Sequence, residues 1–323
     1  MAAKTIETKT IWMNGEFVDA AKATVPFLTP GFHYGIGVFE GIRCYATADG
    51  PAVFRLREHV DRLLDSARCL GFRELPWSAD DLIAAVEETV VRNGYDECYI
   101  RPLMWLDAGG WNLNIDGGTP SLGIAVWPWK DYLGPDALKK GIRANVSSIT
   151  RHHPNATATK AKISGNYVNS FLAKTESVRL GFDEAILLDP NGWVAECTGA
   201  NLFLVRGGTI VTPPSAPVLE GITRDSILTL ASDCGIPVAE KPVSRDQLYI
   251  ADEVFVCGTA AECVALCEID FRKIGAGEAG PVTRALQEAY HAAVRGGNPR
   301  SEAWCHLVER AAPGRVASFG RRR

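Results

Sequence analysis

The segment Ala161-Lys162-Ile163-Ser164-Gly165-Asn166-Tyr167 decides how this chain of 323 residues is interpreted. A lysine precedes a tyrosine, small residues lie between them, and a helical pattern begins directly afterwards. A lysine amine becomes a nucleophile when its surroundings keep it neutral, and it then forms Schiff bases with carbonyl compounds and with pyridoxal 5'-phosphate (PLP). The alternative is that Lys162 is a solvated cation beside Lys160, so the rest of the sequence must decide.

Composition excludes several classes of protein. A hydrophobic content of 46% and a charged content of 22% are ordinary for a globular chain, and the length suits two domains. The net charge of −4 provides no basic field, which argues against nucleic acid or an anionic membrane as partner. Nine scattered cysteines, the absence of a signal-like start and the absence of a membrane-length apolar run together predict a cytoplasmic protein with reduced thiols.

Local patterns predict helices and strands in both halves of the chain. Apolar periodicity and capping residues predict helices at 56–69, 78–93, 168–180, 222–234 and 281–294. A hairpin with an Asn14-Gly15 turn is expected at 12–18, and strands are expected at 38–45, 98–106, 122–129, 141–147, 184–188, 193–197, 201–206 and 253–257. Without strict βαβ alternation, this order favours an α+β class over a doubly wound sheet.

A change of composition at 130–135 predicts a linker. We therefore expect an N-terminal α+β domain at 1–133, a C-terminal α+β domain at 134–300, and a tail at 301–323 that is flexible.

Two other cofactor classes are excluded by spacing. Gly35, Gly37 and Gly41 resemble a dinucleotide fingerprint, but the last gap is one residue too long and a strand follows where a helix must begin. The histidines and the Cys263/Cys267 pair lack partners at metal-ligand spacing, so no metal site is expected.

The demands of PLP find candidates in this sequence. The cofactor needs a lysine, an acid for the pyridine nitrogen and a cradle for its phosphate. Glu196, at a strand end, is a candidate acid, and the helix start at Gly221-Ile222-Thr223 offers backbone N–H groups to an anion. Arg62 is a further phosphate candidate, although its spacing from Glu58 also fits an exposed ion pair on one helix face.

Nine short motifs in one order carry a family resemblance. They are Tyr34-Gly35-x-x-Val38-Phe39-Glu40-Gly41-Ile42-Arg43, Arg57-Glu58-His59-x-x-Arg62-Leu63, Tyr99-Ile100-Arg101-Pro102-Leu103, Ala161-Lys162-x-x-Gly165-Asn166-Tyr167, Glu196-x-x-x-x-Asn201-Leu202-Phe203, Pro213-Pro214, Gly221-Ile222-Thr223-Arg224, Ala251-Asp252-Glu253-Val254 and Gly258-Thr259-Ala260-Ala261-Glu262. From about Ile11 to Arg295, the chain resembles the branched-chain amino-acid aminotransferases. These are fold-type IV PLP enzymes, with the two-domain D-amino-acid aminotransferase-like fold and an active site between the domains.

The resemblance implies a role for each matching residue. Lys162 would carry the cofactor and move the substrate proton as the catalytic residue. The cofactor-binding residues would be Arg62, Lys162, Tyr167, Glu196, Leu219, Gly221, Ile222, Thr223 and Thr259. The substrate contacts would come from Tyr34, Phe39, Gly41, Tyr99, Arg101, Trp111, Leu113, Trp129, Tyr132 and Ala260. In such a family Trp111 and Leu113 would reach the pocket of a partner subunit, which predicts a homodimer or an assembly of dimers.

The resemblance implies ping-pong transamination between an apolar branched-chain L-amino acid and 2-oxoglutarate, giving a 2-keto acid and L-glutamate. Alternatives within the fold are D-amino-acid transamination, (R)-amine transamination and the aminodeoxychorismate lyase reaction. A PLP-binding protein without turnover and a lysine-dependent aldolase without PLP are the alternatives from other classes. The loop at 107–118 departs from the family pattern, since bulky Trp111 stands where a smaller apolar residue is usual.

Overall fold

The computed structural model describes residues 7–129 and 136–309, which form two compact units. Of these residues, unit 1 contains 7–129, 161–165 and 293–309, and unit 2 contains 136–160 and 166–292. The segment that carries Lys162 therefore belongs to unit 1, although its sequence neighbours on both sides belong to unit 2. The predicted linker lies at 130–135, outside the described residues, so the boundary at residue 133 stays a proposal.

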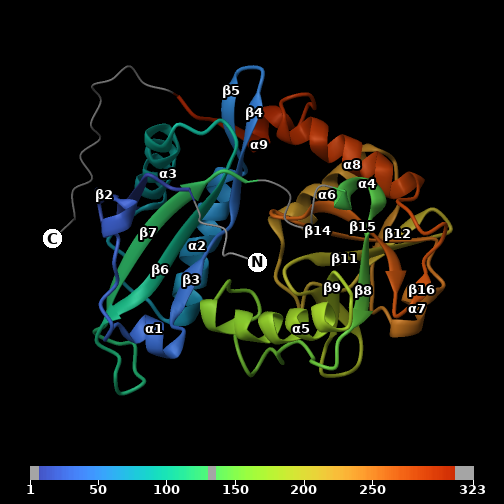
Figure 1. The fold of residues 1–323 in the computed structure, drawn as a ribbon, viewed down its shortest axis with the longest axis horizontal. Helices are drawn as coiled ribbons and strands as arrows, with labels where there is room; N and C mark the ends of the chain where they lie inside the picture. Colours follow the sequence, from blue (N-terminus) through green and yellow to red (C-terminus); the bar gives the residue numbers. More distant parts are fainter. Residues whose placement is uncertain (1–6, 130–135, 310–323) are drawn as a thin grey trace. The chain divides into compact units, whose positions relative to one another are not determined.

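Unit 1 is built on one sheet and two main helices (Figure 1). Its described strands run in the order β17-β5-β4-β6-β7-β1-β2, β3 pairs with β6, and all these pairings are antiparallel. The strands are β1 (Thr10–Met13), β2 (Glu16–Asp19), β3 (Gly37–Phe39), β4 (Ile42–Thr47), β5 (Gly50–Phe54), β6 (Cys98–Ala108), β7 (Thr119–Trp127) and β17 (Cys305–Leu307). The helices are α1 (Pro30–Tyr34), α2 (Leu56–Leu70), α3 (Ala79–Asn93) and α9 (Ser301–Trp304), with a 3-10 turn at Ala20–Lys22.

Local sequence explains the best-defined elements of unit 1. α3 begins at a capping box between Ser78 and Asp81 and ends at Gly94, whose φ of 76° suits glycine. The β1–β2 turn has Asn14 at φ 53° and Gly15 at φ 101°, as the Asn-Gly pair predicts for a tight hairpin. α2 buries Leu56, Val60, Leu63, Leu64 and Ala67, which are the residues that the helical period places on one face.

The single strand predicted at 38–45 is wrong. β3 ends at Phe39 and β4 begins at Ile42, so Glu40 and Gly41 interrupt the strand. The backbone N–H of Glu40 donates to the carbonyl of Pro102 at 2.9 Å. A Cβ on Gly41 would lie only 1.9 Å from the Tyr99 hydroxyl, so that position has no room for a side chain. The interruption places the Glu40 side chain inside unit 1, where it is 0% exposed.

Unit 2 is built on a mixed sheet (Figure 1). Its described strands run β10-β9-β8-β15-β14-β11-β12-β13, with β16 beside β15, and three pairings are parallel: β8–β9, β8–β15 and β12–β13. The strands are β8 (Ile142–Val146), β9 (Glu184–Leu188), β10 (Val194–Cys197), β11 (Asn201–Arg206), β12 (Thr209–Thr212), β13 (Val238–Glu240), β14 (Glu253–Gly258), β15 (Glu262–Ile269) and β16 (Arg272–Lys273). The helices are α4 (Ala137–Lys140), α5 (Tyr167–Arg179), α6 (Ile222–Asp233), α7 (Arg245–Tyr249) and α8 (Pro281–Val294), and a 3-10 turn lies at Ser164–Asn166. The two sheets with flanking helices confirm the α+β class.

α5 forms where it was predicted, but the described residues leave its apolar side chains exposed. The buried residues are the small ones, Ser170, Ala173 and Ser177. Phe171 is 73% exposed and Leu172 is 56% exposed. Periodicity shows which residues share a helix face, and it does not show what lies against that face.

The described part of the expected C-terminal tail belongs to unit 1. Residues 301–304 form α9, and β17 pairs antiparallel with β5, with His306 opposite Val53. Residues 310–323 lie outside the described residues. Within the described ranges, every helix is too short or too polar to cross a membrane.

Candidate active site

Lys162 is fixed to unit 1 through its backbone. Its N–H donates to the Ser66 hydroxyl of α2 at 3.0 Å, and its carbonyl accepts from the N–H of Phe39 in β3 at 3.1 Å. Ile163 forms an isolated bridge with Val38. The side-chain nitrogen of Lys162 lies 4.9 Å from the ring centroid of Phe39. The lysine is half-buried, and main-chain contacts set its position in unit 1 without using the amine.

An aromatic enclosure in unit 1 surrounds Arg101. The guanidinium carbon lies 4.7 Å from the ring centroid of Phe39, 5.2 Å from that of Tyr99 and 5.9 Å from that of Trp127. Trp129 stacks on Tyr99 with ring centroids 4.4 Å apart. Arg101 donates from Nη2 to the Tyr99 hydroxyl at 3.1 Å, whereas its buried Nε has no hydrogen-bond partner among the described residues. A buried N–H of this kind needs an acceptor, and a carboxylate fits the guanidinium best.

Tyr34 and Trp111 form a second, more exposed aromatic group in unit 1. Their ring centroids lie 5.8 Å apart, and Trp111 also packs on His33 at 5.1 Å. Trp111 is 48% exposed and Leu113 is 80% exposed, with Leu113 at a φ of 61°. A left-handed leucine that points into solvent is strained and apolar at once, which marks the 107–118 loop as a contact element.

Arg62 pairs with Glu40, and the predicted pair with Glu58 is wrong. Arg62 donates from Nε to Glu40 Oε1 at 2.7 Å and from Nη2 to Glu40 Oε2 at 2.9 Å. Glu58 pairs instead with Arg55 at 2.7 Å. His59 Nδ1 lies 2.8 Å from the same Glu40 Oε2. Arg62 and His59 lie on α2, whereas Glu40 lies in the strand interruption, so the cluster joins two elements.

The charge states in this cluster follow from burial and pairing. Burial alone would raise the pKa of the Glu40 carboxyl, but the Arg62 charge and the His59 hydrogen bond hold that pKa well below its usual range. Burial lowers the pKa of His59, against the opposing effect of Glu40. An ionised carboxylate can only accept hydrogen bonds, so neutral His59 is the donor through Nδ1–H.

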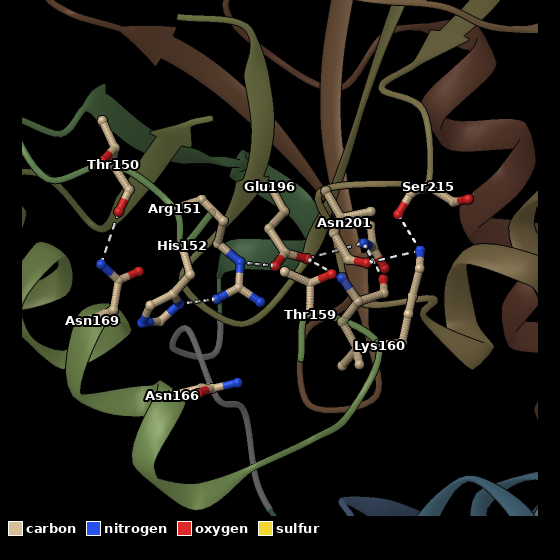
Figure 2. Close-up of polar contacts among 12 residues, drawn as sticks. Thr150, Arg151, His152, Thr159, Lys160, Asn166, Asn169, Glu196, Asn201 and Ser215 are labelled. Carbon is tan, nitrogen blue, oxygen red and sulfur yellow. Dashed lines mark hydrogen bonds and ion pairs between the residues drawn. The ribbon is translucent and has the colours of Figure 1, made fainter. Parts of the chain in front are cut away.

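Glu196 is the centre of a polar group in unit 2 (Figure 2). Arg151 donates from Nε to Glu196 Oε1 at 2.5 Å. The other carboxylate oxygen accepts from Asn201 Nδ2 and from the Leu219 N–H, both at 3.3 Å. Arg151 Nη1 also lies 3.0 Å from His152 Nδ1, and burial followed by the Arg151 charge lowers the pKa of His152. The carboxylate is therefore held ionised by an adjacent cation.

The start of α6 adjoins this group. Gly221 is the N-cap residue, and a Cβ there would lie 2.1 Å from Asn201 Oδ1. Asn201 Nδ2 also donates to the Leu219 carbonyl at 3.0 Å, which fixes the chain just before the helix. Ile222 and Thr223 are buried in the first turn of α6, where the N–H groups are not used by the helix itself. This arrangement is suited to an anion.

The strand ladder of unit 2 brings the remaining cofactor candidate on β14 near Asn201. Glu196 lies opposite Asn201, and Asn201 lies opposite Cys257. Thr259 and Ala260 form the turn that follows β14. The cysteines here are not nucleophiles, because burial raises the pKa values of the Cys197 and Cys257 thiols.

Two predicted site residues remain apart from these groups. Tyr167 is the first residue of α5 in unit 2 and is half-buried. Tyr132 lies outside the described residues.

Sequence reasoning missed four residues that the structure places in these groups, namely Glu40, His59, Trp127 and Arg151. Glu40 and His59 stand inside quoted motifs, and an acid within an apolar strand pattern was the available signal for Glu40. Trp127 ends a strand next to a predicted substrate residue. Arg151 precedes two histidines in an irregular segment, and no periodic pattern marks it.

Comparison with protein families gives a match over most of the chain. Residues 37–269 match the family model described as amino-transferase class IV. The matched region includes Lys162, Glu196 and the first turn of α6.

Among similar curated proteins is a branched-chain-amino-acid aminotransferase of Pseudomonas aeruginosa. It is 46% identical over 299 residues, which cover 93% of this chain and 97% of that protein. The protein of the same name from Escherichia coli is 43% identical over 300 residues, covering 92% and 97% of the two chains.

Solved structures give the same result. A branched-chain amino acid aminotransferase from the source abbreviated T.th., with pyridoxamine 5'-phosphate, has a TM-score of 0.91 and 48% identity, covering 94% of this chain and 100% of that chain. The Escherichia coli branched-chain amino acid aminotransferase also has a TM-score of 0.91, with 43% identity and the same coverage. Since both the family model and these relatives span most of its length, the chain belongs to the class IV aminotransferases.

Proposed function

We propose that this protein transfers the amino group of a branched-chain L-amino acid to 2-oxoglutarate, giving the 2-keto acid and L-glutamate, with PLP as cofactor. Family membership and the printed names of its relatives support the reaction. The observation that carries it is the enclosure around Arg101, where one cation with a buried donor lies among aromatic rings. Such a site accepts an apolar side chain and also the second carboxylate of glutamate.

The residues present fit PLP. The anion-suited start of α6 and Arg62 match a phosphate group, and the ionised Glu196 matches a protonated pyridine nitrogen. We assign Lys162 to the covalent link, Tyr167 to the phenolic oxygen and Leu219 to the ring face. The phosphate contacts would come from Arg62, Gly221, Ile222, Thr223 and Thr259. Two solved relatives carry pyridoxamine 5'-phosphate and N-(5'-phosphopyridoxyl)-L-glutamate, according to their names.

Each protein group has a task in the reaction. PLP, when bound, supplies the electron sink that stabilises charge at the substrate α-carbon. Lys162 Nζ takes the α-proton and returns it on the cofactor side. Glu196 accepts the ring N–H, and Arg151 keeps that carboxylate ionised and oriented. The dipole of α6 and the N–H groups of its first turn hold the anionic end.

Substrate selection would come mainly from unit 1. Arg101 and Tyr34 would receive the second carboxylate of glutamate or 2-oxoglutarate. Apolar side chains would contact Phe39, Gly41, Tyr99, Trp111, Leu113, Trp129, Tyr132 and Ala260. A difference of one methylene in such a pocket is worth about 1–3 kcal/mol, so valine, leucine and isoleucine should all be accepted.

We also propose that the protein is a cytoplasmic homodimer. The nine cysteines are free thiols, which suits a reducing compartment. Apolar residues are exposed on both units: Phe27 at 74% and Phe32 at 71% in unit 1, and Phe171 at 73% in unit 2. Exposed apolar groups of this kind mark an interface, and Trp111 and Leu113 would extend across it to the partner pocket. Sedimentation should give twice the chain mass of 35.0 kDa, and a mass of one chain would contradict the proposal.

Lys162→Ala is the direct test of the reaction. The variant should lose glutamate formation from L-valine and 2-oxoglutarate, together with the visible absorption of lysine-bound PLP. Lys160→Ala is the matched control, because Lys160 pairs with Glu220 at 3.0 Å and has no assigned role. Native turnover by Lys162→Ala, or borohydride trapping of PLP on another peptide, would refute the assignment. D-valine and an (R)-amine serve as negative donors, and preference for either would replace the proposed substrate class.

A further inference from the structure

Glu40 is a deeply buried acid next to a proposed cofactor ligand, and the proposed reaction gives it no role of its own. It is 0% exposed, and the strand interruption between β3 and β4 points its carboxylate toward α2. Burying a charge is costly unless the charge is paired and hydrogen-bonded. A carboxylate retained at such a position therefore serves the groups that pair with it.

Both oxygens of Glu40 are used to orient other side chains. The two bonds from Arg62, at 2.7 and 2.9 Å, are the bidentate arrangement that fixes the plane of a guanidinium. His59, 1% exposed, donates to Oε2 and so fixes the carboxylate itself. The Gly41 N–H adds a weaker bond to Oε2 at 3.3 Å. A guanidinium has five N–H donors in one plane, so fixing two of them fixes the direction of the rest.

The cluster also sets the charge close to Lys162. The same helix α2 that carries Arg62 and His59 provides the Ser66 hydroxyl that accepts from the Lys162 backbone. Two cations, Arg62 and Lys162, thus act on His59 together with one carboxylate, Glu40. Glu40 therefore gives Arg62 both a fixed direction and a partial counter-charge before an anion arrives.

We propose that Glu40, oriented by His59, is a positioning residue that sets phosphate affinity by holding Arg62 ready to receive the phosphate of PLP. The proposal rests on the proposed function, because it takes Arg62 as a phosphate ligand. Side-chain order fixed in advance lowers the entropy lost on binding, so the effect should appear in affinity for phosphate-bearing ligands alone.

The experiment compares PLP with pyridoxal, which lacks only the phosphate. The full-length chain is freed of cofactor, and the dissociation constants of both compounds are measured from their absorption on binding Lys162. Glu40→Gln should raise the dissociation constant of PLP by roughly tenfold to hundredfold, the range of one charge-assisted hydrogen bond. The pyridoxal constant should change by less than about twofold, since one hydrogen bond to Arg62 contributes nothing there.

Glu58→Gln is the matched control. Glu58 lies on α2 one residue from His59 but pairs with Arg55, so both constants should stay unchanged. In an Arg62→Lys background, Glu40→Gln should have no further effect on PLP affinity, because its action passes through the guanidinium. Glu40→Asp is used where Glu40→Gln does not fold, and the ratio of the two constants is read in the same way.

The outcomes separate the two claims. A Glu40 variant that weakens PLP and pyridoxal equally has only a structural role, and this result overturns the proposal. If Arg62→Lys weakens PLP selectively while Glu40→Gln and Glu40→Asp do not, the inference fails and the role of Arg62 stands. If Arg62→Lys leaves PLP affinity unchanged, the assignment of Arg62 to the phosphate fails, and the inference fails with it.

Discussion

Glu40 in unit 1 and Glu196 in unit 2 are both buried carboxylates paired with one arginine, but they are held differently. Glu40 receives two bonds from Arg62 and one from His59, all between 2.7 and 2.9 Å. Glu196 receives one short bond from Arg151, and its other oxygen receives two bonds at 3.3 Å. The side chain of Glu40 is 0% exposed and that of Glu196 is 9% exposed.

The difference separates a support from a reactive group. A carboxylate saturated by short bonds holds its partners and has no capacity for a new donor. One whose second oxygen is held by long bonds can accept a stronger donor, such as the N–H of a protonated ring. Unit 1 therefore uses its acid to place a cation, whereas unit 2 uses a cation to place its acid.

The largest effect that tests this contrast is expected for Glu196→Gln. Losing the charge next to the ring should lower kcat for L-valine by about 10²–10⁴, the usual contribution of a positioned acid or base. Steady-state kinetics at saturating PLP measures it.

Glu184→Gln is the matched control for this prediction. Glu184 is another buried acid of unit 2, 3% exposed, and it bonds to Lys174 at 2.9 Å and to Thr198 at 2.6 Å. This variant should be less stable while keeping kcat. Equal losses of kcat in the two variants would show that any buried acid of the sheet matters.

The two arginines should differ in their effect on stability. Arg62→Met leaves Glu40 buried without this cation, which should cost about 3–5 kcal/mol of unfolding free energy. Arg151→Met should cost less, about 1–3 kcal/mol, because Glu196 keeps the Asn201 and Leu219 donors. Urea denaturation of the cofactor-free protein measures both. The reverse order would contradict the description of Glu40 as the more completely satisfied acid.

Acid should weaken unit 1 through His59. Its folded pKa lies below the ordinary value of 6.5, so between these two values the unfolded chain binds a proton that the folded chain does not. Stability is therefore complete above pH 6.5 and falls as the pH drops below it, by at most about 1.4 kcal/mol per pH unit. Glu40, whose folded pKa is lowered from 4.5, adds a second loss below that pH.

Urea denaturation at several pH values tests this slope. His59→Gln should flatten the decline just below pH 6.5, whereas His153→Gln, at an exposed position, should leave it unchanged. An unchanged slope in His59→Gln would assign the acid sensitivity to other groups.

The helices and strands could be predicted where a local signal decides them. The capping box at Ser78, the Asn14-Gly15 turn and the apolar face of α2 each depend on residues close together in the chain. The lysine, the acid at 196 and the start of α6 were found in the same way, from short motifs.

The pairings within the site could not be predicted, because they join distant parts of the chain. Arg62 has Glu58 on the same helix face, yet its partner Glu40 is 22 residues away. Arg151 and Glu196 are 45 residues apart. Local spacing gives each side chain several acceptable partners, and only the path of the chain through the sheet selects one.

The smallest expected effect concerns Trp111, which tests whether substrate selection belongs to unit 1 and cofactor binding does not depend on this loop. Trp111 is 48% exposed and packs edge-on against Tyr34. Trp111→Ala should open space and raise kcat/KM for bulky donors such as phenylalanine, relative to valine, by roughly tenfold, since one methylene of pocket volume is worth about 1–3 kcal/mol.

The matched control is Trp193→Ala, because Trp193 in unit 2 is also half exposed, at 45%, and lies just before β10 without an assigned role. It should leave both the donor profile and PLP affinity unchanged, whereas Trp111→Ala should change the profile alone. Unchanged relative rates across valine, leucine, isoleucine and phenylalanine would remove Trp111 from the pocket. A change in PLP affinity with Trp111→Ala would show that the loop acts on the cofactor as well, so the division of tasks between the two units would not hold.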